Sequence, residues 1–225
     1  MKALWILTLI ALSLSQPLRA EEPSRLVKNL EAGKKQTLVV YGTSLTAGGA
    51  WVGLLKEKFE KKYPGLLTLI NGAQSGMCST WGLQNVAARV ATKKPDTVLI
   101  EFAINDAHKK FNLTPADAKN NLEGIIDAIL KENPTCEIIL MTMNPAVGVN
   151  SDNREHKENE YYQNYRDVAK ARNFKLIDHY ANWKAIIDKD EKDFLKMAPD
   201  GLHPGADGAK KVILPQLEKS LWGGK

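Results

Sequence analysis

Short apolar runs alternate along this chain with longer stretches whose apolar residues recur every three or four positions. The runs lack strict polar-apolar alternation, and such runs are typical of strands buried on both faces of a sheet. The expected strands are Thr37–Tyr41, Leu67–Asn71, Thr97–Phe102, Glu137–Met143 and Lys175–Asp178. Their regular alternation with helices predicts one α/β domain, with a five-stranded parallel sheet, right-handed crossovers and helices on both sides.

The stretches between the strands show the apolar stripes of amphipathic helices. In the first, Val52, Leu55 and Phe59 recur at helical steps. A later helix is expected to begin at the N-cap Thr114, with Pro115 at its first position. We interpret these stripes as core faces and assign them no chemistry.

The longest polar stretch, Gly148–Glu160, follows the fourth expected strand and has no apolar period. We expect it to form a loop over the carboxyl edge of the sheet. Loops in that position often contact substrate, but a solvated loop without such a role is an equal alternative.

The first twenty residues resemble a secretory signal peptide. Lys2 gives the positive start, an apolar run follows, and Leu18-Arg19-Ala20 ends in a small residue suited to cleavage. The run is too short to span a bilayer as a helix, although an uncleaved membrane anchor is the alternative. We therefore expect a signal peptide over residues 1–20, a mature domain over 21–225, a periplasmic or secreted location and no stable membrane association after cleavage.

The charge of the chain narrows the classes of possible binding partners. The formal net charge of +5 comes from basic residues mixed with acidic ones, which is typical of solvated helix faces and argues against a nucleic-acid partner.

Export permits disulfides, but Cys78 is expected past the carboxyl end of one strand and Cys136 at the amino end of another. We therefore predict two unpaired thiols.

The first strand runs directly into a candidate nucleophile. Gly42 follows Thr37–Tyr41, and Ser44 comes two residues after Gly42. Ligand sites of open α/β sheets lie just past the carboxyl ends of the strands. A serine in this position is by itself more often a helix cap or a turn residue, so its assignment as nucleophile depends on partners elsewhere in the chain.

Those partners are expected near the carboxyl terminus. A serine hydroxyl needs an imidazole to accept its proton and a carboxylate to orient that imidazole. Asp200 and His203 are three residues apart, which allows the carboxylate to reach Nδ1 and leaves Nε2 free. Pro204 disfavours a helical conformation at His203, so we expect a loop just ahead of the last helix.

Two further strand ends supply candidate donors for an oxyanion. Gly76 follows the second strand and can offer its backbone N–H without a side chain in the way. Asn105 follows the third strand and carries a neutral amide donor, although it could also act only as a helix cap. With the N–H of Ser44, these groups form a candidate oxyanion hole, and we expect Asp106 to support the loop beside it.

These blocks, in this order, resemble those of the SGNH (GDSL-type) hydrolase superfamily from Leu38 to about Ala209. Ser44 matches the nucleophile block, Gly76 the glycine block, Asn105 the asparagine block, and Asp200 with His203 the Asp-x-x-His block. The resemblance implies a flavodoxin-like three-layer α/β/α sandwich. It also implies a Ser-His-Asp hydrolase that forms an acyl-enzyme and uses no metal or other cofactor.

The chain departs from the family pattern at two positions. Thr43 stands where the family has an acidic residue, and Ala103 stands where the asparagine block begins with glycine. The acidic residue is generally structural in the family, so we expect altered local hydrogen bonding with activity retained. The nucleophile block is also not the Gly-x-Ser-x-Gly elbow, because Thr46 occupies the last glycine position.

We hypothesise a serine esterase that removes an O-acetyl group from a carbohydrate, with a small-molecule or glycan ester as its partner. Export, the polar stretch and the lack of an obvious apolar acyl channel favour this substrate. One alternative is a lysophospholipase- or thioesterase-like acyl hydrolase. Another, to which only Thr43 points, is a non-catalytic carbohydrate-binding protein of the same fold. The sequence does not define the oligomeric state.

Other polar and aromatic residues receive no catalytic role. The remaining histidines have no metal-ligand spacing: His108, His156 and His179. Three tryptophans are expected to pack in the protein, with sugar stacking as the alternative: Trp51, Trp81 and Trp183.

Overall fold

The computed structural model describes residues 22–155 and 158–224. The expected signal peptide, residues 1–20, lies outside these described residues. Within them, no helix combines the length and apolar character needed to cross a bilayer.

Five parallel strands form one sheet in the order β2-β1-β3-β4-β5. The strands are β1 (Gln36–Gly42), β2 (Leu67–Asn71), β3 (Thr97–Glu101), β4 (Glu137–Thr142) and β5 (Lys175–Asp178). Each expected strand is confirmed, with bounds that differ by at most one residue. The strand order is that of flavodoxin-like doubly wound folds, and the predicted α/β fold class is confirmed.

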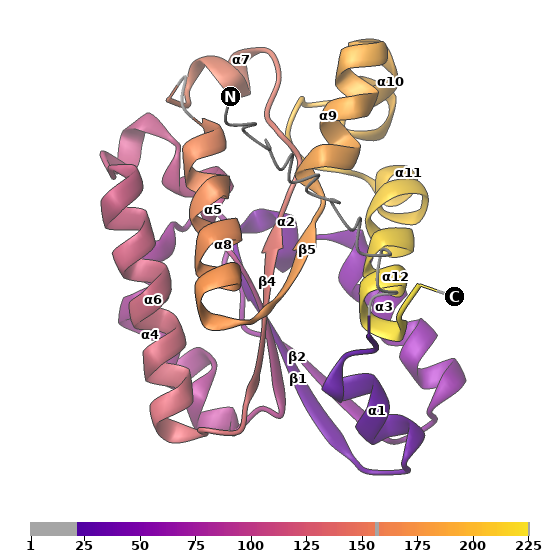
Figure 1. Ribbon diagram of the computed structural model, residues 1–225. Helices are drawn as coiled ribbons and strands as arrows, with labels where there is room; N and C mark the ends of the chain where they lie inside the picture. The colour runs from indigo at the N-terminus through magenta and orange to yellow at the C-terminus, as the bar shows by residue number, and fades with distance from the viewer. Residues whose placement is uncertain (1–21, 156–157, 225) are drawn as a thin grey trace, which may run out of the picture.

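Helices cover both faces of this sheet (Figure 1). One face carries α4 (Ser79–Arg89), α6 (Pro115–Glu132) and α8 (Glu158–Arg172), and the other carries α1 (Arg25–Glu31), α3 (Ala50–Lys62) and α12 (Leu214–Trp222). Two helices, α9 (Tyr180–Lys189) and α10 (Glu191–Met197), follow β5 as a pair. Short helices lie after strands or ahead of α12: α2 (Ser44–Ala47), α5 (Ala103–Asp106), α7 (Val149–Asp152) and α11 (Ala206–Gly208).

Local sequence signals explain where α6 begins. The Thr114 hydroxyl accepts a hydrogen bond from Asp117 N–H, and Thr114 N–H donates to the Asp117 carboxylate, which closes a capping box at the start of α6. Pro115 occupies the first turn, as predicted.

The stretch after β4 is not a continuous loop as expected, because Val149–Asp152 forms one helical turn and α8 begins at Glu158. A single turn is too short to show an apolar period.

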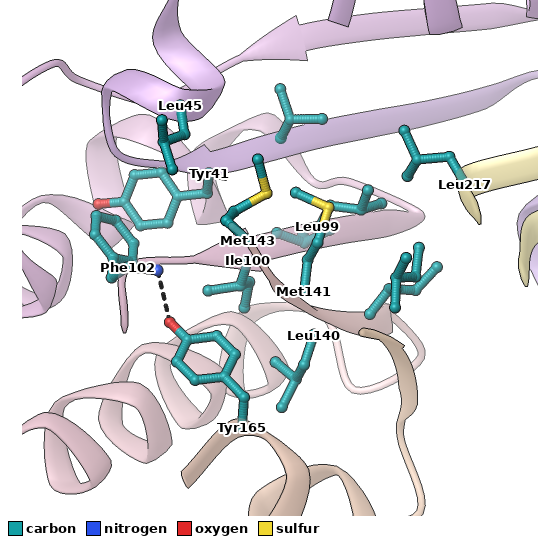
Figure 2. Close-up of a cluster of buried hydrophobic side chains, with 14 of the residues drawn as sticks. Tyr41, Leu45, Leu99, Ile100, Phe102, Leu140, Met141, Met143, Tyr165 and Leu217 are labelled. Atoms are coloured by element: carbon teal, nitrogen blue, oxygen red, sulfur yellow. Dashed lines mark hydrogen bonds between the residues drawn. The ribbon is translucent and has the colours of Figure 1, made fainter. Parts of the chain in front are cut away.

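The core lies between the sheet and its helices (Figure 2). The side chains of Tyr41, Ile100 and Phe102 are fully buried, and Phe102 N–H donates to the Tyr165 hydroxyl at 2.7 Å. This bond ties the end of β3 to α8, just before α5. Trp51 and Trp183 are also buried, which confirms their packing role.

Both cysteines are free, as predicted, and both are buried. Cys136 lies directly before β4, where burial raises the pKa of its thiol to about 12. A thiol that stays protonated in this way is a poor nucleophile at neutral pH.

His179 follows β5 as a fully buried imidazole. Among the described residues, neither ring nitrogen has a hydrogen-bond partner. Burial lowers the pKa of His179 to about 4, because the charged ring would lose its hydration without gaining an acceptor.

Burial of His179 contributes a loss of stability in mild acid. Below pH 6.5 the unfolded chain binds a proton at His179 that the folded chain excludes, so the contribution of His179 to the free energy of unfolding falls as the pH drops toward 4. The total effect is on the order of 3 kcal/mol. His179→Phe removes this contribution, so the difference in the free energy of unfolding between variant and wild type shifts in favour of the variant as the pH falls from 7 to 4, as measured by urea unfolding at several pH values. Equal slopes in the variant and the wild type would contradict the assignment.

Candidate active site

Ser44 lies where β1 turns into α2, at the carboxyl edge of the sheet. Thr43 is the N-cap of α2, and its hydroxyl accepts a hydrogen bond from Leu45 N–H at 3.2 Å. Ser44 is the first residue of the helix and is partly exposed. The cap fixes the turn, and the short helix leaves the serine side chain at its surface.

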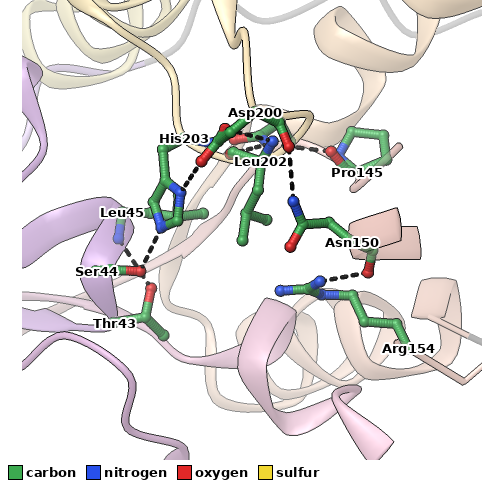
Figure 3. Close-up of polar contacts among 10 residues, drawn as sticks. Thr43, Ser44, Leu45, Pro145, Asn150, Arg154, Asp200, Leu202 and His203 are labelled. Atoms are coloured by element: carbon green, nitrogen blue, oxygen red, sulfur yellow. Dashed lines mark hydrogen bonds and ion pairs between the residues drawn. The ribbon is translucent and has the colours of Figure 1, made fainter. Parts of the chain in front are cut away.

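A continuous chain of hydrogen bonds joins Ser44 to the carboxyl-terminal part of the protein (Figure 3). Ser44 Oγ lies 2.9 Å from His203 Nε2, and His203 Nδ1 lies 2.6 Å from Asp200 Oδ2. The structure thus brings together the three side chains that the sequence analysis singled out, although 159 positions separate the serine from the histidine.

The Asp200–His203 loop is closed around the aspartate. The second carboxylate oxygen, Oδ1, accepts the N–H groups of Leu202 at 3.0 Å and His203 at 2.8 Å. Burial alone would raise the pKa of Asp200, but these N–H groups and the His203 ring more than offset it, and the net pKa is below the usual value. The carboxylate is therefore ionised near neutral pH and suited to orient an imidazole.

Two residues give this loop its shape. Gly201 has a φ of +78°, and a Cβ there would come within 2.6 Å of the Val147 carbonyl oxygen, so only glycine fits. His203 is followed by Pro204 and lies in non-helical backbone ahead of α11, as predicted.

The candidate oxyanion donors converge on the same edge. The segment with Gly76 is tied to the end of β1, because Gln74 N–H donates to the Gly42 carbonyl at 3.0 Å. Gly76 is exposed with a φ of +75°. Among the described residues, the N–H groups of Ser44 and Gly76 donate to no other group, which leaves both available to a ligand.

Asn105 lies in α5 and is nearly buried. Its Nδ2 donates to the Met77 carbonyl at 2.9 Å, which places the amide against the Gly76 segment and leaves its second N–H unused in that bond. Asp106 beside it accepts Ser79 N–H at 2.7 Å, so its expected role in supporting the loop is confirmed. Burial raises the pKa of Asp106 to about 7.

The segment after β4 holds the histidine loop in place from Val147 onward. Val147 N–H donates to the Gly201 carbonyl at 2.9 Å, and Asn150 Nδ2 donates to the Asp200 carbonyl at 2.7 Å. The buried Arg154 donates from Nη1 to the Asn150 carbonyl at 2.5 Å and from Nε to the Ile104 carbonyl at 2.9 Å. Arg154 thus joins the Asn105 side of the site to the Asp200 side.

Sequence reasoning missed Arg154 and also Glu101, a buried carboxylate at the end of β3. Nothing in the sequence around Arg154 distinguishes it from a solvated residue, because its partners are backbone carbonyls. Glu101 carried a usable signal, since a charged residue closes an otherwise apolar strand.

A hollow of about 430 Å³ opens beside Ser44 and His203. Its other lining residues are small or mainly apolar: Leu45, Gly48, Gly49, Trp51, Ser75, Pro204 and Ile213. In residues 22–155 and 158–224, no cluster of three His, Cys, Asp or Glu side chains is arranged to hold a metal ion. The arrangement can therefore deliver an activated hydroxyl to a substrate seated beside an apolar wall.

Comparisons with known proteins show what the chain is similar to. The family model for GDSL-like lipases and acylhydrolases matches residues 40–211. The Escherichia coli (strain K12) protein named thioesterase 1/protease 1/lysophospholipase L1 is 28% identical over 201 residues, which cover 84% of this chain and 85% of that protein. An arylesterase from Vibrio mimicus is 27% identical over 180 residues, with coverage of 75% and 80%. The crystal structure of a lipase/acylhydrolase from Enterococcus faecalis matches with a TM-score of 0.68 and 27% identity, over 82% of this chain and 95% of that chain.

Arg154→Met tests the bridge between the two sides of the site. The buried Ile104 carbonyl and the half-buried Asn150 carbonyl lose their donors, and the buried one alone costs about 1–3 kcal/mol in the free energy of unfolding. We expect kcat to fall about tenfold as the two sides lose their alignment. The matched control is Arg172→Met, which removes a partly exposed ion pair with Asp127 and is expected to cost less than about 1 kcal/mol. Urea unfolding and ester hydrolysis measure both effects, and equal behaviour of the two variants would refute the bridge.

Proposed function

The chain belongs to the GDSL-like lipase/acylhydrolase family and is a carboxylic ester hydrolase, and we propose that Ser44 is the nucleophile of its reaction. The observation that carries this proposal is the 2.9 Å contact between Ser44 Oγ and His203 Nε2, continued by the contact between His203 Nδ1 and Asp200.

In the first half of the proposed reaction, Ser44 Oγ attacks the ester carbonyl carbon while His203 Nε2 takes its proton. The N–H groups of Ser44 and Gly76 and the Asn105 amide stabilise the negative oxygen of the tetrahedral intermediate. His203 then gives its proton to the leaving alcohol, and the acyl group stays on Ser44. Asp200 holds the imidazole in the required tautomer and stabilises its positive charge.

In the second half, His203 removes a proton from water, which attacks the acyl-enzyme carbonyl. The tetrahedral intermediate collapses, Ser44 recovers its proton from His203, and the free acid leaves. Both halves use the same base and the same donors, so no further side chain is needed.

As substrate, we propose a short acyl ester of a bulky polar alcohol, with an O-acetyl group on a carbohydrate as the leading case. The side chains of His203 and Asp200 are 46% and 52% exposed, so a large hydrophilic leaving group can approach the proton donor from solvent. A periplasmic or secreted location stays part of this proposal.

The apolar side of the hollow favours a second candidate, a lysophospholipase- or thioesterase-like hydrolase of longer acyl chains. Leu45, Pro204 and Ile213 would contact such a chain. The name of the Escherichia coli relative agrees with this chemistry. A non-catalytic carbohydrate-binding role has lost its support, because the chain belongs to a hydrolase family and its relatives are named enzymes.

Ser44→Ala is expected to lower kcat/KM for a small ester by about 10⁴-fold or more, because the remaining residues have no comparable nucleophile to activate. The fold is expected to survive, as checked by thermal unfolding. Ser151→Ala, which changes an exposed serine of α7, is the control and should keep full activity. Substantial turnover by the Ser44 variant would remove Ser44 from the mechanism.

An acyl-length series separates the two substrate candidates. The short-acyl proposal predicts the highest kcat/KM for acetyl esters, including acetylated oligosaccharides, and weak activity beyond about eight carbons. Gly48→Leu narrows the hollow at a position where a Cβ meets only the Ser44 carbonyl at 3.8 Å, and should spare acetyl esters. Gly53→Leu, an exposed position on α3 with free space around it, is the control. A preference for long chains that Gly48→Leu abolishes would establish the second candidate.

A further inference from the structure

Glu101 faces the nucleophile turn from the neighbouring strand. It is the last residue of β3, and in the sheet register it pairs with Gly42, the last residue of β1. Its side chain is 2% exposed. A Cβ on Gly42 would lie 2.2 Å from Glu101 Oε1, so the glycine leaves the space that the carboxylate fills.

The carboxylate accepts hydrogen bonds from both sides of Ser44. Oε1 accepts Thr43 N–H at 2.7 Å and the Thr46 hydroxyl at 2.7 Å. The Thr43 hydroxyl lies 3.0 Å from Oε1 and 3.1 Å from Oε2, and it also accepts Leu45 N–H. One buried carboxylate therefore holds the residue before Ser44 and the residue two positions after it.

These hydrogen bonds place a carboxyl group beside Thr43, where the chain departs from the family pattern. The SGNH pattern has an acidic residue at that position, directly after the glycine of the nucleophile block, and this chain has none. In the structure a carboxylate occupies the same neighbourhood, supplied by the facing position of β3, and Thr43 serves as its donor. The turn around Ser44 is thus bonded to a carboxyl group that comes from β3 and not from position 43.

We propose that Glu101 is a positioning residue that replaces the missing acidic residue at position 43 and fixes the Thr43–Thr46 turn, so that Ser44 stays aligned with His203. This inference rests on the proposed role of Ser44 as nucleophile. A role in alignment changes the reactivity of Ser44 and kcat, whereas a role in folding alone changes only stability.

The sharpest test is a double-variant cycle. Glu101→Gln keeps the shape but replaces one of the two acceptor oxygens by an amide N–H₂, and is expected to lower kcat about tenfold with little change in KM. Thr43→Asp alone places a second carboxylate against Glu101 and is expected to cost about 100-fold. The double variant Thr43→Asp/Glu101→Gln restores the acid at position 43 and should return to within about threefold of wild type, a non-additive result.

A second pair of variants tests the same contact without altering the buried carboxyl group. Thr46→Val removes the hydroxyl donor and keeps the shape, and should lower kcat about fivefold, whereas Thr46→Ser keeps the donor and should behave like wild type. The rate at which a fluorophosphonate modifies Ser44 should follow kcat in both pairs. Asp178→Asn, which changes a strand-end carboxylate bonded to Arg166 and Thr142, controls for lost stability and should leave kcat unchanged.

The outcomes separate this inference from the proposed function. If the Thr43 and Glu101 effects are additive, or if Thr46→Val keeps the wild-type rate of Ser44 modification, Glu101 is only structural and the positioning role is wrong. If the fluorophosphonate does not modify Ser44 in the wild type, the proposed nucleophile itself is wrong. Recovery in the double variant together with slow modification in Thr46→Val would support the inference.

Discussion

The hydrogen bond between Ser44 Oγ and His203 Nε2 joins two residues that are 159 positions apart, and the site depends on both ends being held independently. On the serine side, β1 lies between β2 and β3, and its carboxyl end meets theirs because the strands are parallel. On the histidine side, the loop is closed on Asp200 and clamped by the segment after β4. A shift of about 1 Å on either side would break a contact that must transfer a proton.

Buried polar groups carry much of this alignment. Glu101 and Asp106 are acids within a few residues of each other, and burial raises their pKa values to about 8 and about 7. Each accepts hydrogen bonds from N–H and hydroxyl groups that would otherwise be unpaired. The free-energy cost of burying each polar group is therefore offset by its hydrogen bonds to its neighbour. Arg154 does the same for two carbonyl oxygens on the other side of the site. A purely apolar interior could not fix these loops, because apolar contacts do not specify direction.

The sequence predicted the strands to within one residue because strands buried on both faces appear as unbroken apolar runs that end at turn residues. It also identified Ser44, Asp200 and His203, because their chemistry requires particular side chains at strand ends and in a short loop. It did not predict α7 or the role of Arg154, whose partners are backbone carbonyls without a side-chain signature. Glu101 was overlooked although a charge at the end of a buried strand needs a partner. That partner, the turn around Thr43, is adjacent only through strand register.

The same packing limits where substrate preference can change. Gly49 cannot accept a side chain, because a Cβ would come within 2.1 Å of the Leu45 carbonyl oxygen. Trp51 and Ile213 are almost fully buried and belong to the core as well as to the wall of the hollow. Gly48 is different, since its surroundings are open and its φ of −109° suits any residue. Most residues of the wall therefore cannot change without a loss of fold stability. The size of the acyl group that fits depends on the few positions, such as Gly48, that the core does not use.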